Sequence, residues 1–183
     1  MKCAIYVLYD QNEIQNIEQN YKILSKTIDH HILISFINEF NFSFKFTQVF
    51  CKPEIFIDET DRVLKFFKIL SNILKYLNIK RYNNAVIVSG KLKLNEFKTN
   101  SITCLLDSIQ SIEDVDFVLF KENGVVTDSL ILCRIWFLMT NLEYYDCNIE
   151  DFKRKTNYRD HKFYIDLFLT SPFIHTRNLE DYI

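Results

Sequence analysis

The chain has 183 residues, 48% of them hydrophobic and 25% charged, which suffices for one compact domain but not for two ordinary ones. Its 22 Lys and Arg residues against 24 Asp and Glu residues give a formal net charge of -2, and without a long basic run we expect neither nucleic-acid binding nor attraction to an acidic membrane. The only two glycines, Gly90 and Gly124, stand alone, which excludes the glycine-rich phosphate loops of dinucleotide-binding proteins, P-loop proteins and kinases.

The cysteines and the apolar runs indicate in which cellular compartment the protein resides. Five cysteines at wide spacings, without a CxxC pair or a histidine at ligand spacing, predict buried free thiols in a reducing compartment. The longest apolar stretch, 130–139, is about half the length of a membrane span and contains Arg134, and the first nine residues lack a signal-peptide pattern. We therefore expect a cytoplasmic protein. Abundant Ile, Asn, Lys, Phe and Tyr are typical of an AT-rich genome, such as that of a large DNA virus or a parasite, so the compartment would be a host cytoplasm or a virion into which the protein is packaged.

Strands and helices alternate in the first half of the chain. Residues 2–9 form an apolar run typical of a strand buried on both faces, and apolar residues from Ile14 to Ile28 recur at helical spacing. Residues 31–37 predict a second strand, and the alternation of Phe with polar residues over 42–50 predicts a third, ended by Pro53. Capping residues 58–61 and an apolar stripe from Val63 to Leu77 then predict a long helix.

The second half continues this alternation. Residues 85–88 predict a buried strand ending at Ser89-Gly90, residues 102–112 a helix, and residues 115–120 a strand stopped by Asn123-Gly124. Asp128 is a candidate N-cap for a buried helix across 130–145, because that apolar run is too long for one strand. A loop over 150–160 precedes a last helix with inward residues from Phe163 to Phe168.

This order predicts one α/β domain over residues 1–183, with a mostly parallel twisted sheet covered by helices on both faces. In such sheets ligands bind beyond the carboxyl ends of the strands. The residues that follow the predicted strands are Tyr9 and Asp10, Asn38 and Glu39, Ser89 to Lys91, and Lys121 to Gly124.

Several segments together resemble a known family. They are the opening strand Ala4–Asp10, the helix Val63–Leu77 with the strand Tyr82–Ser89 behind it, the strand Asp116–Phe120 leading into Val126–Arg134, and the late segment Tyr158–Tyr164. This layout resembles the small nucleotide-sugar glycosyltransferases of the GT-A type, especially the viral and lipopolysaccharide-synthesis-like members. The resemblance implies the nucleotide-diphospho-sugar transferase fold and transfer of a hexose from a nucleotide sugar to a glycan or protein acceptor.

The resemblance also implies roles for individual residues. Asp10 would lie near the base or ribose, Lys91 near the diphosphate, and Asp128 or Asp160 would act as the base toward the acceptor hydroxyl. The family holds Mn²⁺ or Mg²⁺ with carboxylates after the strand that ends at Ser89, but here the stretch reads Ser89-Gly-Lys-Leu-Lys-Leu94, without a carboxylate. Lys91 or Lys93 would then supply a fixed cation in place of the metal.

Each candidate also has a purely structural interpretation. Asp10 can form the turn that ends the first strand, Asp128 can cap a helix, Lys91 can be a solvated loop residue, and Asp160-His161 can be an exposed loop pair. The one Asp-x-Asp, Asp114 to Asp116, precedes its strand and indicates a turn rather than a metal site, and His30-His31 has no third ligand nearby. A non-catalytic structural or interaction protein on the same fold, including a homo-oligomer, is therefore the alternative to a transferase.

Overall fold

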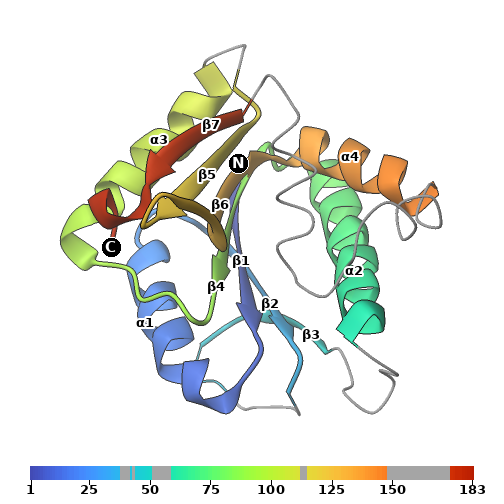
Figure 1. Cartoon of the computed structure of the whole chain (residues 1–183), viewed down its shortest axis with the longest axis horizontal. Helices are drawn as coiled ribbons and strands as arrows, with labels where there is room; N and C mark the ends of the chain where they lie inside the picture. Colours follow the sequence, from blue (N-terminus) through green and yellow to red (C-terminus); the bar gives the residue numbers. More distant parts are fainter. Residues whose placement is uncertain (38–41, 43, 51–58, 112–114, 148–173) are drawn as a thin grey trace.

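The apolar runs form one seven-stranded sheet in the order β3-β2-β1-β4-β6-β5-β7 (Figure 1). The structure is a computed structural model that describes residues 1–37, 42, 44–50, 59–111, 115–147 and 174–183. The strands are β1 (Lys2–Leu8), β2 (His30–Ser35), β3 (Thr47–Phe50), β4 (Asn84–Ser89), β5 (Phe117–Glu122), β6 (Val125–Arg134) and β7 (Ile174–Asn178).

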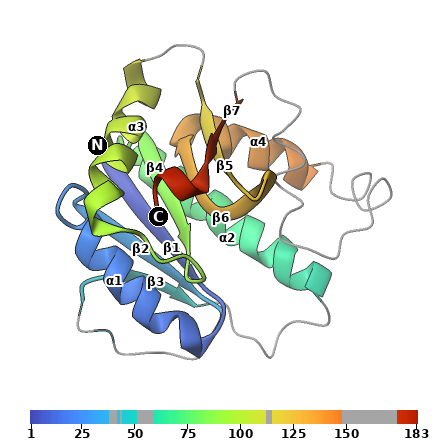
Figure 2. The same ribbon diagram turned by 60° about the vertical axis from the view of Figure 1, so that its left-hand side comes forward.

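Helices cover both faces of this sheet, as predicted. Helices α1 (Ile14–Leu24) and α3 (Thr99–Ser111) lie on one face, and α2 (Glu59–Ile79) and α4 (Ile135–Cys147) lie on the other (Figures 1 and 2). Short 3-10 helices η1 (Gln11–Glu13), η3 (Glu96–Lys98) and η4 (Leu179–Asp181) complete the described elements. Among the described residues, no helix has both the length and the hydropathy of a membrane span.

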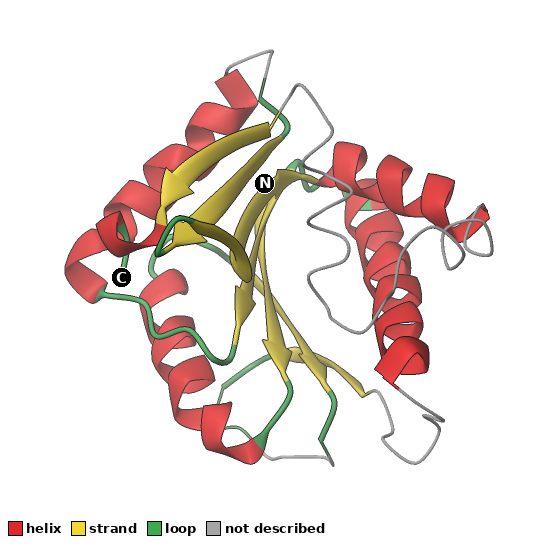
Figure 3. Ribbon diagram, viewed as in Figure 1, coloured by secondary structure: helices red, strands yellow, loops and turns green. Residues whose placement is uncertain are grey.

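The sheet is mostly parallel, which confirms the predicted fold class. β1 pairs in parallel with β2 and β4, β2 with β3, and β5 with β7, whereas β6 is antiparallel to β4 and β5. The chain leaves β1 for β2 on one side and later returns to β4 on the other, so β1 and β4 flank a topological switch point. The loops that follow β1 and β4 lie at one edge of the sheet (Figure 3).

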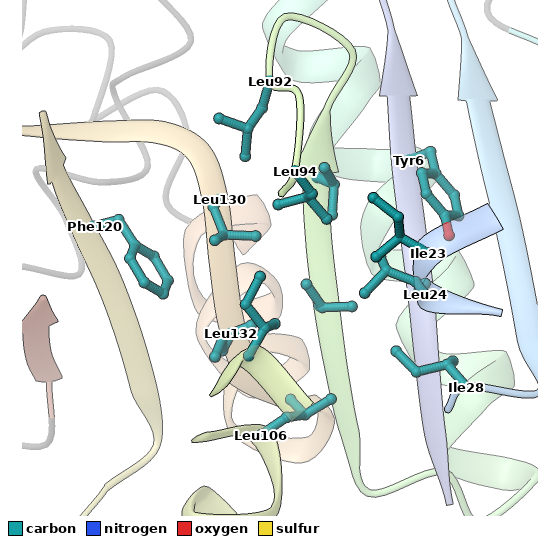
Figure 4. Close-up of a cluster of buried hydrophobic side chains, with 14 of the residues drawn as sticks. Tyr6, Ile23, Leu24, Ile28, Leu92, Leu94, Leu106, Phe120, Leu130 and Leu132 are labelled. Atoms are coloured by element: carbon teal, nitrogen blue, oxygen red, sulfur yellow. The ribbon is translucent and has the colours of Figure 1, made fainter. Parts of the chain in front are cut away.

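Two apolar clusters, one on each face, hold the layers together. Side chains from β1, β4, β5 and β6 pack against α1 and α3 in the cluster of Figure 4, which includes Tyr6, Leu24, Leu94, Leu106 and Leu132. Because β1 and β4 are buried on both faces, they are apolar at nearly every position. Cys3 and Cys133 are buried in the opposite cluster, and burial raises the pKa of the Cys133 thiol to about 12, whereas Cys104 is exposed.

The helix expected from Asp128 is wrong over residues 128–134. Residues 125–134 form β6, and α4 begins only at Ile135. Leu130 to Cys133 are fully buried between β4 and β5, so both of their faces are apolar and periodicity does not separate strand from helix. Asn123 (φ 51°) and Gly124 (φ 79°) form the turn that joins β5 to β6 as a hairpin.

The strand expected over 42–50 is also shorter than predicted, because among the described residues of this segment only Thr47–Phe50 form a paired strand. The rings of Phe44 and Phe46 instead pack 4.7 and 4.8 Å from the ring of Tyr21. Strand β7 was not predicted, and the helix expected over 163–168 lies outside the described residues.

The two neighbouring histidines have different surroundings, and the Nε2 of His30 is buried without a hydrogen-bond partner among the described residues. His31 is buried, with its Nδ1 2.9 Å from the Tyr6 hydroxyl and its Nε2 2.8 Å from the carbonyl oxygen of Ile28. Burial lowers the pKa of His31, and this favours the neutral ring that can both donate and accept.

Helix α2 ends in an unusual cap. The N–H of Tyr82 donates to the carbonyl of Leu77 (2.9 Å), and the N–H of Arg81 donates to the carbonyl of Asn78 (3.0 Å), the two bonds of a Schellman motif. The motif needs a left-handed residue, usually glycine, but here Arg81 has φ 64°. The carboxyl-terminal end of α2 therefore has backbone strain at Arg81.

We predict that Arg81→Gly raises the free energy of unfolding by about 0.5–1 kcal/mol, because glycine adopts this conformation without the Cβ clash. Urea denaturation of the purified variants measures the change. Arg81→Ala is the control: it removes the charged side chain but keeps Cβ, so an equal gain in this variant would contradict the backbone explanation.

Candidate functional site

A polar pocket lies at the carboxyl edge of the sheet, between the ends of β1 and β4. Its volume is about 580 Å³, within the range of small-molecule sites, and it is lined by Tyr9, Asp10, Asn12, Glu13, Asn16 and Lys91. Its walls are the loop after β1, the start of α1 and the loop after β4 (Figure 1). The pocket therefore occupies the switch point at which open α/β sheets bind ligands.

The loop after β1 is shaped by the side chain of Asp10. Asp10 has extended backbone angles, and its Oδ1 accepts a hydrogen bond of 3.2 Å from the N–H of Asn12, which caps η1. Asp10 thus has the turn-forming role considered for it. Its exposed carboxylate also lines the pocket, so the two interpretations are compatible.

Glu13 joins the two walls of the pocket. It is only 5% exposed, and its Oε2 accepts a hydrogen bond of 2.9 Å from the N–H of Tyr9. A Cβ atom at Gly90 would lie 2.7 Å from Oε2 and 2.8 Å from Cβ of Glu13. The loop after β4 approaches Glu13 this closely because residue 90 has no side chain.

Two asparagines of α1, here called the amide clamp, hold the loop after β4. Asn16 Nδ2 donates to the carbonyl of Gly90 (2.9 Å). Asn20 is fully buried, donates to the carbonyl of Leu92 (2.8 Å) and accepts from the N–H of Leu94 (2.8 Å). The amide clamp fixes the backbone on both sides of Lys91.

Lys91 is the cation among the residues that line this pocket. Its Nζ lies 5.6 Å from the ring centroid of Tyr9, and that ring stacks on Phe36 with centroids 5.1 Å apart. A cation–π contact at an exposed site contributes only about 0.5–1 kcal/mol, so an anion in the pocket can draw the ammonium away from the ring. The backbone N–H of Lys91 donates to Ser89 Oγ at 3.3 Å.

The structure brings together two of the four predicted site residues, Asp10 and Lys91. Asp128 lies in β6 and not at a helix start, two residues before Leu130, which pairs with Val88 near the carboxyl end of β4. Its backbone therefore lies toward the same edge of the sheet as the pocket. Asp160 lies outside the described residues, and Lys93 is exposed but does not line the pocket.

The Asp-x-Asp segment lies far from this edge. Asp116 precedes β5 at the amino end, where its Oδ1 is 3.4 Å from Nε of Arg134. Burial raises the pKa of its carboxyl group, and the nearby guanidinium offsets part of that rise. Asp114 lies outside the described residues, and within the described part of the chain no three His, Cys, Asp or Glu side chains gather as metal ligands would.

Sequence reasoning missed Glu13 and Asn16 as lining residues and Asn20 as a support of the pocket. Glu13, Asn16 and Asn20 recur at spacings of three and four residues, which places them on one face of the helix that follows β1. Polar residues on the inward face of a helix need hydrogen-bond partners, and this pattern could have indicated their role in the pocket.

Comparison with solved structures identifies the fold. A glycosyltransferase involved in the glycosylation of the major capsid of PBCV-1 matches 97% of this chain and 82% of its own, with a TM-score of 0.62 and 10% identity. A protein from Desulfovibrio desulfuricans G20, provisionally assigned as a nucleotide-diphospho-sugar transferase, matches 97% of this chain and 79% of its own, with a TM-score of 0.57 and 6% identity. No protein-family model and no curated protein sequence matches the chain significantly. The chain thus has the nucleotide-diphospho-sugar transferase fold of the GT-A type, as the resemblance implied.

We predict that Gly90→Ala lowers the free energy of unfolding by about 1–3 kcal/mol, because the added methyl group collides with Glu13 and moves the loop. Thermal and urea unfolding measure the loss. Lys93→Ala, at an exposed position three residues further on, is the control and should stay within about 0.5 kcal/mol of the parent protein. Equal stability of the parent and both variants would show that the close contact between Gly90 and Glu13 imposes no constraint.

Proposed function

We propose that the pocket between β1 and β4 binds the nucleoside diphosphate of a nucleotide sugar, and that the protein transfers a hexose to a hydroxyl group of a glycan or protein acceptor. The observation that supports this most directly is the convergence of Asp10 and Lys91, 81 residues apart in sequence, on one polar pocket at the switch point. The fold shared with sugar transferases supports the same proposal.

The lining residues have the chemistry that such a ligand needs. The carboxylate of Asp10 and the amide of Asn12 can bind hydroxyl or N–H groups of a nucleoside. Lys91 presents its ammonium group to the pocket, where a diphosphate would exchange the contact with the Tyr9 ring for an ion pair. This arrangement neutralises part of the charge on the leaving group.

The transfer step itself is a substitution at the anomeric carbon. The acceptor oxygen forms a bond to that carbon, the bond to the diphosphate oxygen breaks, and the leaving diphosphate keeps the electron pair. A carboxylate takes the hydroxyl proton. Asp128 is our first candidate for this base, because its backbone lies toward the pocket's edge of the sheet, and Asp160 remains a candidate from the sequence alone.

The donor set after β4 does not fit a divalent cation. Ser89 Oγ accepts a hydrogen bond from the N–H of Lys91, and the next side chain is itself a cation. The two carboxylates that line the pocket, those of Asp10 and Glu13, come from the β1 side and not from the loop after β4, where the family places its metal ligands. We therefore propose that Lys91, rather than Mn²⁺ or Mg²⁺ held at this strand end, balances the diphosphate charge.

The proposed use of Lys91 in place of a divalent metal ion also supports a second candidate function, a non-catalytic interaction protein that keeps the transferase fold. A single lysine provides less charge than a divalent metal ion, so bound nucleotide sugar could persist without transfer. Binding without release of nucleoside diphosphate, together with self-association in sedimentation, would favour this candidate over the transferase.

We predict that a UDP- or GDP-sugar stabilises the protein in a thermal-shift panel, and equally with and without Mn²⁺. Ligand at 100 times its dissociation constant adds about 2.7 kcal/mol of stability. Lys91→Met should remove this gain and lower the stability of the free protein by no more than about 1 kcal/mol, the value of the lost contact with Tyr9. Lys91→Arg should keep most of the gain.

Lys93→Met is the matched control, since Lys93 is exposed two residues further on and does not line the pocket. Release of nucleoside diphosphate in the presence of hydroxyl acceptors then separates transfer from binding alone. A flat response to the whole panel, or an equal loss in the Lys91 and Lys93 variants, would overturn the proposed donor site.

A further inference from the structure

A second pocket lies at the opposite, amino-terminal edge of the sheet. Its volume is about 270 Å³, and it is lined by Asn78, Tyr82, Asn83, Asn84, Arg134 and Trp136. It forms where α2 ends, β4 begins and β6 passes into α4, near the end marked N in Figure 1. Strand β4 has six residues and therefore separates this pocket by roughly 20 Å from the pocket between β1 and β4, which is called the donor pocket here after its proposed ligand.

Trp136 gives this pocket an exposed aromatic wall. It is the only tryptophan in the chain, and it is 60% exposed on the first turn of α4. Tryptophan is usually well buried, since its large apolar surface is costly to leave in water. Tyr82 supplies a second ring, held 5.2 Å from the ring of His30. Two aromatic side chains thus offer apolar faces to a ligand.

The frame of the pocket is rigid because backbone hydrogen bonds from several elements meet there. The N–H of Asn83 donates to the carbonyl of Met1 (2.9 Å), and the N–H of Ile135 donates to the carbonyl of Asn83 (2.8 Å). The cap of α2 fixes Asn78 relative to Tyr82. A preformed site of this kind loses little conformational entropy on binding.

The charge in this pocket is internally balanced. The guanidinium of Arg134 donates to the carbonyl of Ile109 through Nε (3.1 Å) and Nη2 (2.7 Å), and its Nε lies 3.4 Å from the carboxylate of Asp116. None of the other side chains that line the pocket is charged. The pocket therefore favours a neutral ligand over an anion or a cation.

The remaining polar groups are side-chain amides. Within the described part of the chain, no hydrogen bond holds the amides of Asn78 and Asn83, and both residues are exposed. Each amide offers an acceptor oxygen and donor N–H groups. Neighbouring hydroxyl groups on one ligand are also donors and acceptors, so they complement this pair.

We propose that this pocket is a binding site for a neutral saccharide, with the apolar C–H face of a sugar ring on Trp136 and the ring hydroxyls on Asn78 and Asn83. A ligand with an apolar face and a hydroxyl-rich edge matches the aromatic wall, the free amides and the balanced charge together. This site goes beyond the proposed transfer activity and does not depend on it, because it shares no residue with the donor pocket.

The test uses Trp136 as an intrinsic probe of the whole chain. Methyl glycosides of glucose, galactose, mannose, fucose and xylose, and short neutral oligosaccharides built from them, are titrated at millimolar concentration while tryptophan emission is recorded. We expect a saturable change with at least one member of the panel, and calorimetry should give the same affinity.

Variants then place the site. Trp136→Ala and Asn83→Ala should each weaken binding at least tenfold in calorimetry, whereas Trp136→Tyr should keep most of it. Phe97→Ala, which removes an aromatic ring that is 94% exposed elsewhere, and Lys91→Met in the donor pocket should leave it unchanged. Circular dichroism confirms that each variant is folded.

Two results would overturn the proposal. One is the absence of any saturable change across the panel. The other is an emission change that depends on protein concentration, in a protein that sediments as a dimer. Trp136 would then lie in a contact between two copies. Loss of UDP- or GDP-sugar binding bears only on the donor pocket, so the two proposals fail separately.

Discussion

The pocket between β1 and β4 depends above all on one buried amide, the side chain of Asn20. It joins α1 to the loop after β4 by satisfying a backbone carbonyl and a backbone N–H that would otherwise be buried without partners. Leaving such a group unpaired costs about 1–3 kcal/mol, so this residue does more for the loop than an apolar contact of the same size would. Asn16 and Glu13 continue the same interface to the mouth of the pocket. Because these three side chains join the two loops, Asp10 and Lys91 face a common space instead of separate stretches of solvent.

Much of the fold could be predicted from sequence because burial leaves a simple pattern. Strands β1, β2 and β4 are apolar on both faces, and α2 has a clear apolar stripe, so these elements were found. The same simplicity caused the error at β6, where a doubly buried strand passes directly into a helix and the apolar run has no internal boundary. Asn123-Gly124 predicts the end of β5, but this dipeptide is also a strong hairpin signal, which on its own predicts an antiparallel partner for β5. The Phe-rich segment before β3 alternates because its rings pack around Tyr21, which a period-two pattern does not distinguish from a strand.

The candidate site was predictable only where topology alone decides position. Asp10 and Lys91 follow strands whose carboxyl ends share an edge, and this rule placed both near one pocket without any knowledge of side-chain contacts. Glu13 and Asn16 were missed because their role depends on which face of α1 meets the β4 loop, a tertiary fact that helical spacing restricts but does not determine. The predicted N-cap role of Asp128 was wrong for a related reason. It assumed that a helix begins near residue 130, whereas this segment is part of the sheet and the helix begins at Ile135.

The single glycine at the pocket serves packing and not phosphate binding. The N–H of Gly90 donates to the carbonyl of Val7 (2.8 Å) and its carbonyl accepts from Asn16 (2.9 Å), so both of its backbone groups are already used within the protein. A phosphate cradle needs several unused N–H groups aimed at the ligand, and Gly90 offers none. Under the proposed function, Gly90 would therefore add nothing to the recognition of a diphosphate, and Lys91 would supply the positive charge. At 4 Å and an effective dielectric constant near 20, one such pair of unit charges is worth about 4 kcal/mol before desolvation and screening, and a divalent ion would double the charge. Under the proposed function, the chemistry of this pocket would depend on how far a flexible lysine can replace a fixed metal. That difference would separate a slow transferase from a protein that only holds the nucleotide sugar.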